Sequence, residues 1–580
     1  MNILGLDYGH NATVCLIQDG RITFCQSEER FNRIKNSVGF PERTLDYVYQ
    51  NVLPPDSIDR AVLFQKSIYG YLDLKANSFR SRPPATHMAF ADGKPLRLRI
   101  LGSALHKRIG DLRRAINERR ENLRAEATAY FSRAIRIPAD KIVFLDHHLC
   151  HAFSPLPNIV VWREALIFTL DGEGDEKCAT VSRFGDGRLA VLSEVDRQHS
   201  LGYYYAYTTM ILGMKALEHE FKVMGLAPYA KRQYFEEILV RLKILLRINK
   251  HGRWESRPAL SDLASELERL FRYQRFDNIS GAIQQLTEDL IIEWVRYWVK
   301  KTDCHDIAVA GGVFMNVKAC QKLAELPEVN RIIVMPSSGD ESCALGAAAW
   351  GAAEFDGGHP LKPFEHLYLG RSYSDEEVTA TLEKTRAFER YAITRPENIN
   401  RAVGELLAEN KVVARCSGRM EFGARALGNR SILADARHGG NVKVINEAIK
   451  CRDFWMPFAP AILAEDFSRY VRNPKSISAD FMCITFDSTP EAQVDLCAAV
   501  HPMDKTLRPQ RVRPQFNPEF HEIISTFKAR TGVGGCLNTS FNLHGEPVVC
   551  SPEDAISTVD RSGLEYLAIG PFLLTKTRSS

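Results

Sequence analysis

Two histidines, His147 and His151, stand four residues apart in the run HHLCH, and an apolar segment that ends at Asp171 follows them. On a helix, residues with this spacing lie about 5–6 Å apart on one face, so their imidazoles can share one metal ion. A carboxylate at a strand end completes a mixed nitrogen and oxygen site, and a cation held there polarises a carbonyl group for acyl-type transfer. An isolated pair of this kind also fits a helix-surface or capping role.

A second carboxylate extends this candidate site. Residues 332–335 form an apolar run that predicts a buried strand, and Asp340 follows it, just before an alanine-rich helix predicted over 343–353. Carboxylates at strand ends of α/β sheets face a shared crevice, which is the usual location of chemistry. The predicted metal ligands are therefore His147, His151, Asp171 and Asp340.

The elements that would position these ligands repeat one pattern. A strand ending in Asp, a glycine-containing turn, a second strand, an Asp-Gly-Arg hairpin turn and a third strand occur over residues 3–26 and again over 165–195. Actin-like ATPases use such duplicated units to build two lobes around a nucleotide, although β-meanders in general also look alike. We therefore predict an internal duplication.

Two glycine-containing loops are candidates for nucleotide contact. Gly311 and Gly312 follow the apolar run 307–310, and Asn316 lies just beyond, so backbone amides there can approach a phosphate or ribose. Residues 418–431 interleave glycines with three arginines, whose guanidinium forks suit a polyanion such as ATP or an acyl phosphate. A solvated basic loop is the alternative. The arginines are Arg419, Arg425 and Arg430.

The remaining segments suggest the domain organisation. Residues 354–372 are rich in Gly and Pro and predict a linker or surface loop. Beyond it we predict helices at 375–386 and 398–409 and a strand at 411–416. The basic stretch 94–136 has the periodicity of an amphipathic helix, which is a solvated face or a contact for an anionic substrate, lipid surface or partner.

Composition narrows the class of protein. The chain has 580 residues, 75 basic and 71 acidic, with a net charge of +4, so it lacks the basic excess of nucleic-acid binders. No apolar run reaches the length of a membrane span, and the chain starts without the basic region of a secretory signal. The 13 cysteines include no Cys-x-x-Cys pair, which favours a reducing cytoplasm.

Longer strings occur along nearly the whole chain. The first half holds GHNA at 9–12, SEERF at 27–31, DHHLCHA at 146–152 and KVMGLAPY at 222–229. The second half holds GRMEFG at 418–423, LGNRS at 427–431, PFAP at 457–460 and LNTSFN at 537–542. In this order they resemble the O-carbamoyltransferase family of antibiotic-tailoring and nodulation-factor enzymes.

The resemblance implies an α/β protein with two catalytic domains. Residues 1–355 would form an actin-like (ASKHA) two-lobe transfer domain with a basic insert at about 66–136. Residues 373–580 would form a YrdC-like α/β domain that makes carbamoyl adenylate. Its Lys-x-Arg and Ser-x-Asn signatures would offset the charge of ATP and carbamoyl phosphate and orient them by hydrogen bonds. The matching residues are Lys450, Arg452, Ser540 and Asn542.

The resemblance also implies a two-step reaction. Carbamoyl phosphate and ATP, the latter with Mg²⁺, give carbamoyl adenylate, and the carbamoyl group then passes to a hydroxyl of a small-molecule acceptor such as a natural product or sugar. By analogy, the metal at the N-terminal site would be Fe²⁺ or another divalent ion. His10 is the candidate general base, or else a turn histidine in a phosphate-binding loop; Glu220 is a second candidate, and Lys222 would contact phosphate or ribose.

Some alternatives stay open. His148 and His151 could face one ion in place of the 147/151 pair, and residues 501–510 depart from the family's HVDGTARPQ string. A threonylcarbamoyl-type tRNA enzyme would need an RNA-binding face, and a protein-maturation enzyme would carry cysteine clusters. A non-catalytic actin-like nucleotide-binding protein would leave the Lys-x-Arg and Ser-x-Asn signatures unexplained. The acceptor is not identified, and a homodimer is the working expectation.

Overall fold

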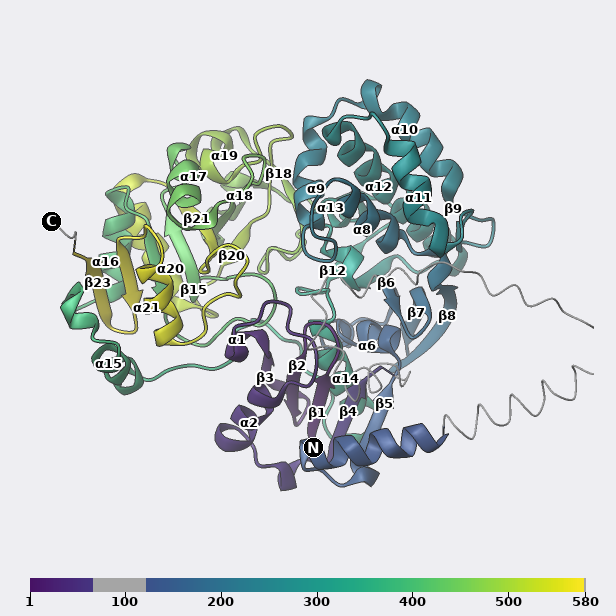
Figure 1. Ribbon diagram of the computed structural model, residues 1–580, viewed down its shortest axis with the longest axis horizontal. Coiled ribbons are helices and arrows are strands. Elements are labelled where there is room, and N and C mark those ends of the chain that lie inside the picture. Colours follow the sequence, from purple (N-terminus) through teal and green to yellow (C-terminus); the bar gives the residue numbers. More distant parts are fainter. Residues whose placement is uncertain (66–120, 578–580) are drawn as a thin grey trace, which may run out of the picture.

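The computed structural model describes residues 1–65 and 121–577 (Figure 1). The N-terminal half contains two five-stranded sheets with one strand order, β3-β2-β1-β4-β5 and β8-β7-β6-β11-β12. In each sheet three consecutive strands pair antiparallel, and the next two strands add in parallel. The predicted duplication is therefore confirmed. The strands are β1 (Asn2–Asp7), β2 (Thr13–Gln18), β3 (Arg21–Ser27), β4 (Arg60–Phe64), β5 (Ile142–Leu145), β6 (Glu164–Gly174), β7 (Lys177–Gly185), β8 (Arg188–Asp196), β11 (Asp306–Ala310) and β12 (Arg331–Val334).

Matching hairpin turns fix the register of the two copies. Asp19-Gly20 joins β2 to β3, and Asp186-Gly187 joins β7 to β8. All four residues have positive φ, between 48° and 74°. This is the geometry of a type I′ turn, whose twist matches that of the flanking strands.

Helix α14 (Glu341–Phe355) lies at the centre of the N-terminal half and packs against β1, β4 and α6 (His147–Phe153). It is rich in alanine and buried around most of its circumference, as expected for a helix enclosed by protein. A Cβ at Gly346 would lie 1.7 Å from the carbonyl oxygen of Cys150. The absence of a side chain there lets α14 and α6 approach closely, which brings their N-terminal turns together.

Further helices cover the second sheet and enclose a large apolar core (Figure 1). The longest, α12, is buried along one side and contacts α8, α9, α10 and α13. These helices are α8 (Leu201–Ile211), α9 (Glu220–Leu226), α10 (Arg232–Leu245), α11 (Leu260–Phe271), α12 (Phe276–Thr302) and α13 (Val317–Glu325).

The C-terminal half is built on a mixed eight-stranded sheet of order β13-β23-β22-β14-β15-β21-β16-β20. The helices and strand predicted at its start are present as α15 (Asp375–Lys384), α16 (Ile399–Ala408) and β14 (Val413–Cys416). Its other elements include β13 (Tyr391–Thr394), β15 (Arg430–Ala434), β16 (Ala459–Leu463), β20 (Gln510–Val512), α20 (Pro518–Thr531), β21 (Gly535–Ser540), α21 (Pro552–Asp560), β22 (Tyr566–Ile569) and β23 (Phe572–Lys576).

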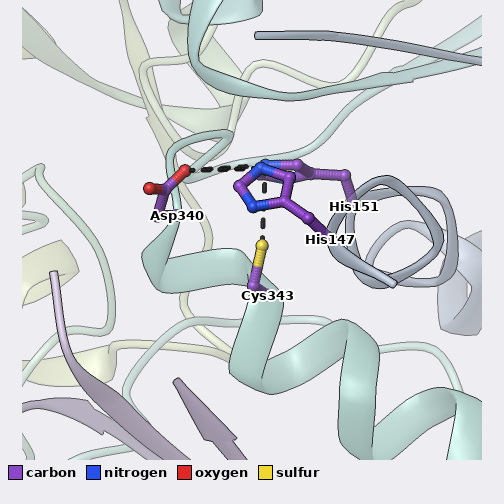
Figure 2. Close-up of side chains that lie close together, drawn as sticks. All are labelled: His147, His151, Asp340 and Cys343. Carbon is purple, nitrogen blue, oxygen red and sulfur yellow. Dashed lines mark hydrogen bonds and ion pairs between the residues drawn. The ribbon is translucent and has the colours of Figure 1, made fainter. Parts of the chain in front are cut away.

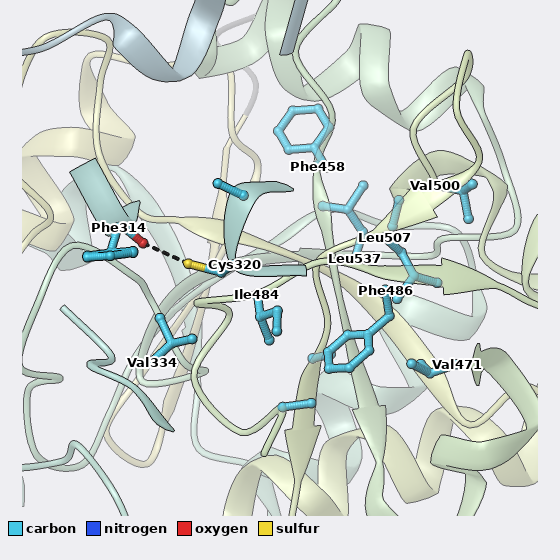
Figure 3. Close-up of a cluster of buried hydrophobic side chains, with 14 of the residues drawn as sticks. Phe314, Cys320, Val334, Phe458, Val471, Ile484, Phe486, Val500, Leu507 and Leu537 are labelled. Carbon is cyan, nitrogen blue, oxygen red and sulfur yellow. Dashed lines mark hydrogen bonds between the residues drawn. The ribbon is translucent and has the colours of Figure 1, made fainter. Parts of the chain in front are cut away.

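One apolar cluster crosses from the first half into the second (Figure 3). Phe314 and Val334 come from the N-terminal half, and Ile484 and Phe486 come from the C-terminal half. The ion pair between Lys318 and Asp504 adds a polar contact across the same junction. The two halves are thus held by a shared core.

The segment 354–372 differs from the expectation of a linker or surface loop. It has no helix or strand beyond the end of α14, but Leu361, Phe364, Leu367 and Leu369 are buried in a core cluster. These apolar side chains pack in one cluster with residues of both halves. Most of the basic stretch 94–136, with its helical periodicity, lies outside the described residues. The part that the structure describes is helical over 121–135.

Among residues 1–65 and 121–577, no helix combines the length and apolar composition that crossing a membrane requires.

Candidate metal centre and anion site

The four predicted metal ligands lie together. His147 and His151 project from one face of α6, and Asp340, the N-cap of α14, approaches them (Figure 2). The Nε2 atom of His151 lies 3.1 Å from Oδ2 of Asp171 and 3.7 Å from Oδ1 of Asp340. The Nε2 atom of His147 lies 3.9 Å from the same two oxygens. His147, His151 and Asp340 belong to one group of possible ligand atoms within 4.8 Å of one another, and Asp171 contacts both imidazoles.

Backbone amides hold Asp171. Gly312 donates its N–H to Oδ2 at 2.8 Å, and the amide of Gly172 contacts Oδ1. Strand β6 does not end at Asp171 as predicted but continues to Gly174, with an irregular register after Leu170. The irregularity turns the carboxylate toward α6. The paired-glycine turn therefore positions a candidate ligand.

One ring nitrogen of His148 is bonded outside this cluster. Its Nδ1 atom is 2.7 Å from Oγ1 of Thr169 on β6, and its ring centroid is 6.3 Å from that of His151, compared with 4.7 Å between His147 and His151. Burial lowers the pKa of His148 well below its ordinary value. This geometry favours the 147/151 pair over the 148/151 alternative.

Burial and charge make the cluster suitable for a cation. Burial alone would lower the pKa of His151, but hydrogen bonds and charge interactions with Asp171 and Asp340 raise it to about 9. Contacts with the two histidines lower the pKa of Asp171 despite its burial. The Nε2 atom of His147 is buried without a hydrogen-bond partner. An unpaired ring nitrogen beside carboxylates fits a divalent metal, which would replace the proton shared in this cluster.

Gly174 provides the first test of this geometry. A Cβ at position 174 would lie 2.2 Å from Cγ of His147, so Gly174→Ala must displace the imidazole. We expect divalent-metal affinity to fall at least about tenfold, because orientation of a ligand ring controls its affinity. Isothermal titration with Co²⁺ measures this. Gly185→Ala, at the end of the neighbouring strand with nothing within 4 Å of the new carbon, should bind normally.

Two acidic residues beside the cluster were not predicted as site residues. Asp7 is fully buried at the end of β1, and its Oδ2 atom has no hydrogen-bond partner. Burial, with repulsion from Asp340 and Glu341, raises the pKa of Asp7 well above its ordinary value. The internal duplication was the missed signal, since it pairs Asp7 with Asp171. Glu341 directly follows Asp340, and its carboxylate accepts a hydrogen bond from the hydroxyl of Ser337.

The candidate bases occupy different places. His10 lies in the loop after β1, with its Nε2 atom buried and unpartnered. The side chain of Phe64 packs against both this loop, at Gly9, and the ring of His147. Glu220 begins α9 and accepts the amide of Leu217 at 2.6 Å.

Lys222 lies on α9 and is the third candidate of this group. Its ammonium pairs with Asp453 of the C-terminal half at 3.0 Å, and its carbonyl oxygen accepts a hydrogen bond from the indole N–H of Trp455 at 3.1 Å. Lys222 is therefore at the junction of the halves. Whether it contacts phosphate or ribose stays a prediction.

The Lys-x-Arg and Ser-x-Asn residues form one cluster. Lys450 is buried, and its Nζ atom lies 2.7 Å from Oδ1 of Asn542 and 3.2 Å from Oγ of Ser540. The Ser540 hydroxyl donates to the same Asn542 oxygen at 2.7 Å. Burial and the neighbouring Arg452 lower the pKa of Lys450. Residues 90 or more positions apart in the sequence thus meet at the end of β21.

Three half-buried arginines interact with this cluster through their charges and form an arginine cluster, which we define as Arg425, Arg452 and Arg508. Burial and repulsion from Arg425 lower the pKa of Arg452 to about 10. Burial and repulsion from the other two lower the pKa of Arg508, whose Nε atom is buried without a partner. Within the described ranges, none of the three pairs with an acidic side chain at ion-pair distance. Uncompensated guanidinium groups favour an anionic ligand.

The other predicted nucleotide contacts have partners within the protein. Arg419 donates to the carbonyl oxygens of Leu369 and Gly370, and Arg430 donates to those of Ser417 and Cys550. Asn316 caps α13 and exchanges hydrogen bonds with Gln284. Gly311 has a φ of 102°, and a Cβ there would lie 2.4 Å from the carbonyl oxygen of Leu170. Their roles in nucleotide binding stay predictions.

The loop that carries Arg425 connects the two clusters. Arg30 of α1 (Glu29–Asn32) donates to the carbonyl oxygen of Gly423 at 2.8 Å, and Ala424 donates its amide to Oγ of Ser337 at 3.2 Å. Arg425 is attracted by the charge of Glu341, the neighbour of Asp340. The loop at 423–425 therefore contacts the N-terminal half and also carries one of the three arginines.

Comparison with known proteins identifies the group. Residues 2–349 match the family model of the carbamoyltransferase N-terminus, and residues 404–576 match that of the carbamoyltransferase C-terminus. Nodulation protein NolNO of Sinorhizobium fredii is 30% identical over 98% of this chain and 80% of its own length. The 3'-hydroxymethylcephem-O-carbamoyltransferase of Amycolatopsis lactamdurans is 30% identical over 45% of this chain and 47% of its own length.

Among solved structures, full-length HypF in its phosphate- and nucleotide-bound form overlaps 62% of this chain and 56% of its own at 12% identity. The TM-score of this overlap is 0.37, which is a weak structural similarity. The family models and the relatives show that the chain belongs to the carbamoyltransferase family. Its relatives mark it as a transferase. The resemblance inferred from the sequence strings is confirmed.

Proposed function

We propose that this protein is an ATP-dependent O-carbamoyltransferase that makes carbamoyl adenylate in its C-terminal half and transfers the carbamoyl group in its N-terminal half. The domains would be an actin-like one over 1–355 and a YrdC-like one over 373–580. The observation that carries the proposal is that the two parts of the chain match the N- and C-terminal carbamoyltransferase family models, while one part holds the predicted metal ligands and the other holds the arginine cluster. The loop at 423–425, which carries one of these arginines, also makes hydrogen bonds to the N-terminal half.

The arginine cluster and Lys450 support the first step. With one water consumed, carbamoyl phosphate and ATP would give carbamoyl adenylate, pyrophosphate and phosphate. Lys450 and Arg452 would neutralise the phosphates, and Ser540 and Asn542 would orient the carbamoyl group through hydrogen bonds. Because Lys450, Ser540 and Asn542 are already held together by hydrogen bonds, little reorganisation would be required when charge develops on the reacting oxygens.

The N-terminal cluster supports the second step. His147, His151, Asp171 and Asp340 would hold the divalent metal, which supplies positive charge to the carbamoyl oxygen or adenylate phosphate. A base would take the proton from the acceptor hydroxyl as its oxygen attacks the carbamoyl carbon, and AMP leaves. Passage within one chain would limit hydrolysis of the mixed anhydride if water is kept out between the sites.

Incubation with carbamoyl phosphate, Mg²⁺-ATP and a panel of hydroxylated small molecules tests the proposal. We expect pyrophosphate and AMP to form and the mass of one acceptor to rise by a carbamoyl group. Formation of neither pyrophosphate nor AMP with any acceptor in the panel would overturn the proposed activity.

Glu220 gives a prediction about pH. Burial raises the pKa of its carboxyl group to about 7. If this group is the base, it must be ionised, so the transfer rate should rise tenfold per pH unit below about 7 and level off above it. Glu220→Gln should lose this dependence and most of the transfer activity. A pH profile unchanged in Glu220→Gln would assign the base role elsewhere, with His10→Gln as the next variant to measure.

A further inference from the structure

A thiol lies inside the candidate metal centre. Cys343 is on the first turn of α14, three residues beyond Asp340, so both side chains lie on the side of the helix that faces α6 (Figure 2). Its Sγ atom is 3.5 Å from Nε2 of His151, and the side chain is fully buried. The ligand atoms of His147, His151, Asp340 and Cys343 all lie within 4.8 Å of one another.

The spacing of these atoms is that of ligands around one ion. With metal–nitrogen bonds of about 2.1 Å and metal–sulfur bonds of about 2.3 Å, a nitrogen–metal–sulfur angle of about 110° places nitrogen and sulfur about 3.6 Å apart. The observed Sγ to Nε2 distance of 3.5 Å agrees with this value. The contact is a weak hydrogen bond between the thiol and the imidazole, which a metal would replace.

Two histidine atoms point to a ligand independently of the thiol. The Nε2 atom of His147 is buried and unpartnered, and His147 has only 2% of its surface exposed. The Nδ1 atom of His151 contacts Oγ of Ser342 at 3.2 Å. In neutral His151, a hydrogen bond donated by Nδ1 to Ser342 would leave Nε2 available to a metal. Both histidines offer a ring nitrogen to the group of ligand atoms that includes Sγ of Cys343.

We propose that Cys343 is an additional ligand of the divalent metal, so that the donor set is nitrogen, oxygen and sulfur, in place of the nitrogen and oxygen set expected from the sequence. On binding, a metal–sulfur bond forms and the thiol proton passes to solvent. A thiolate shifts selectivity toward iron, zinc and cobalt and away from magnesium and calcium. The inference rests on the metal part of the proposed function.

Cobalt spectroscopy tests the proposal without any activity assay. Co²⁺ added to the metal-free full-length protein should produce visible ligand-field bands and a near-ultraviolet sulfur-to-cobalt charge-transfer band. Cys343→Ser should lose the charge-transfer band, keep ligand-field bands and bind Co²⁺ at least about tenfold more weakly. Cys150→Ser, a second buried thiol on α6, should keep the band.

X-ray absorption of the wild-type protein provides a measurement that needs no variant, with one sulfur expected at about 2.3 Å. Ligand-field bands without a charge-transfer band or sulfur scatterer would overturn the role of Cys343 and leave the four-ligand centre and the carbamoylation proposal intact. A charge-transfer band that persists in Cys343→Ser would also overturn it. Failure of the wild type to bind any divalent metal would overturn this inference and the metal-assisted step, whereas pyrophosphate formation would still report the C-terminal activity.

Discussion

Replacement of His147 by alanine should reduce acceptor carbamoylation at least about 100-fold while pyrophosphate still forms near the wild-type rate. His147 supplies a buried ring nitrogen that faces Asp171 and Asp340 at 3.9 Å and has no other partner. Its loss removes a ligand but leaves the Lys450 cluster untouched, because that cluster is built from the C-terminal half. Parallel assays of pyrophosphate and carbamoylated acceptor, together with metal content, measure the effect.

His148→Ala is the matched control. The two histidines are adjacent on α6, but one ring nitrogen of His148 is bonded to Thr169, outside the metal-ligand cluster. Its loss should cost about 1–3 kcal/mol of unfolding free energy, because a buried hydrogen bond is broken. Metal content should stay at the wild-type level. Equal loss of both reaction steps in His147→Ala would contradict the division of labour between the halves.

The parts of this site that the sequence predicts are those set by local structure. His147 and His151 share a face because they are one helical turn apart. Asp171 lies late in β6 and Asp340 follows β12, and both strands run parallel to β11, so both carboxylates reach one edge of the sheet. The duplication is equally local, since each Asp-Gly turn fixes its own hairpin.

The parts that the sequence does not predict depend on packing between distant segments. Cys343 reaches the metal centre only because Gly346 lets α14 lie close to α6. Arg508 joins the arginine cluster because it lies between Thr506–Leu507, which pair with strand Phe486–Ser488, and β20, which pairs with β16. Residue type also does not reveal that Arg419 and Arg430 donate to backbone carbonyls, whereas Arg425 stays available.

Arg452→Ala should stop adenylate formation without weakening the fold. Arg452 lies beside Arg425 and Arg508, with no ion-pair partner in the part of the chain that the structure describes, and burial with repulsion lowers its pKa to about 10. Its removal relieves repulsion between like charges, so Tm should equal or exceed that of the wild type. Loss of one preorganised charge should slow pyrophosphate release by about 10²- to 10³-fold.

Slower pyrophosphate formation together with an unchanged or higher Tm would identify Arg452 as a ligand-binding residue. A structural arginine would lose stability on replacement, as we expect for Arg415, which bonds to Gly428 and Asn429. Arg530→Ala, an exposed arginine of the same half, controls for the change in net charge. Transfer from supplied carbamoyl adenylate should survive in Arg452→Ala, because the metal ligands are intact. A variant that releases pyrophosphate at the wild-type rate would exclude Arg452 from the first step and leave Lys450 and Arg508 to neutralise the phosphates.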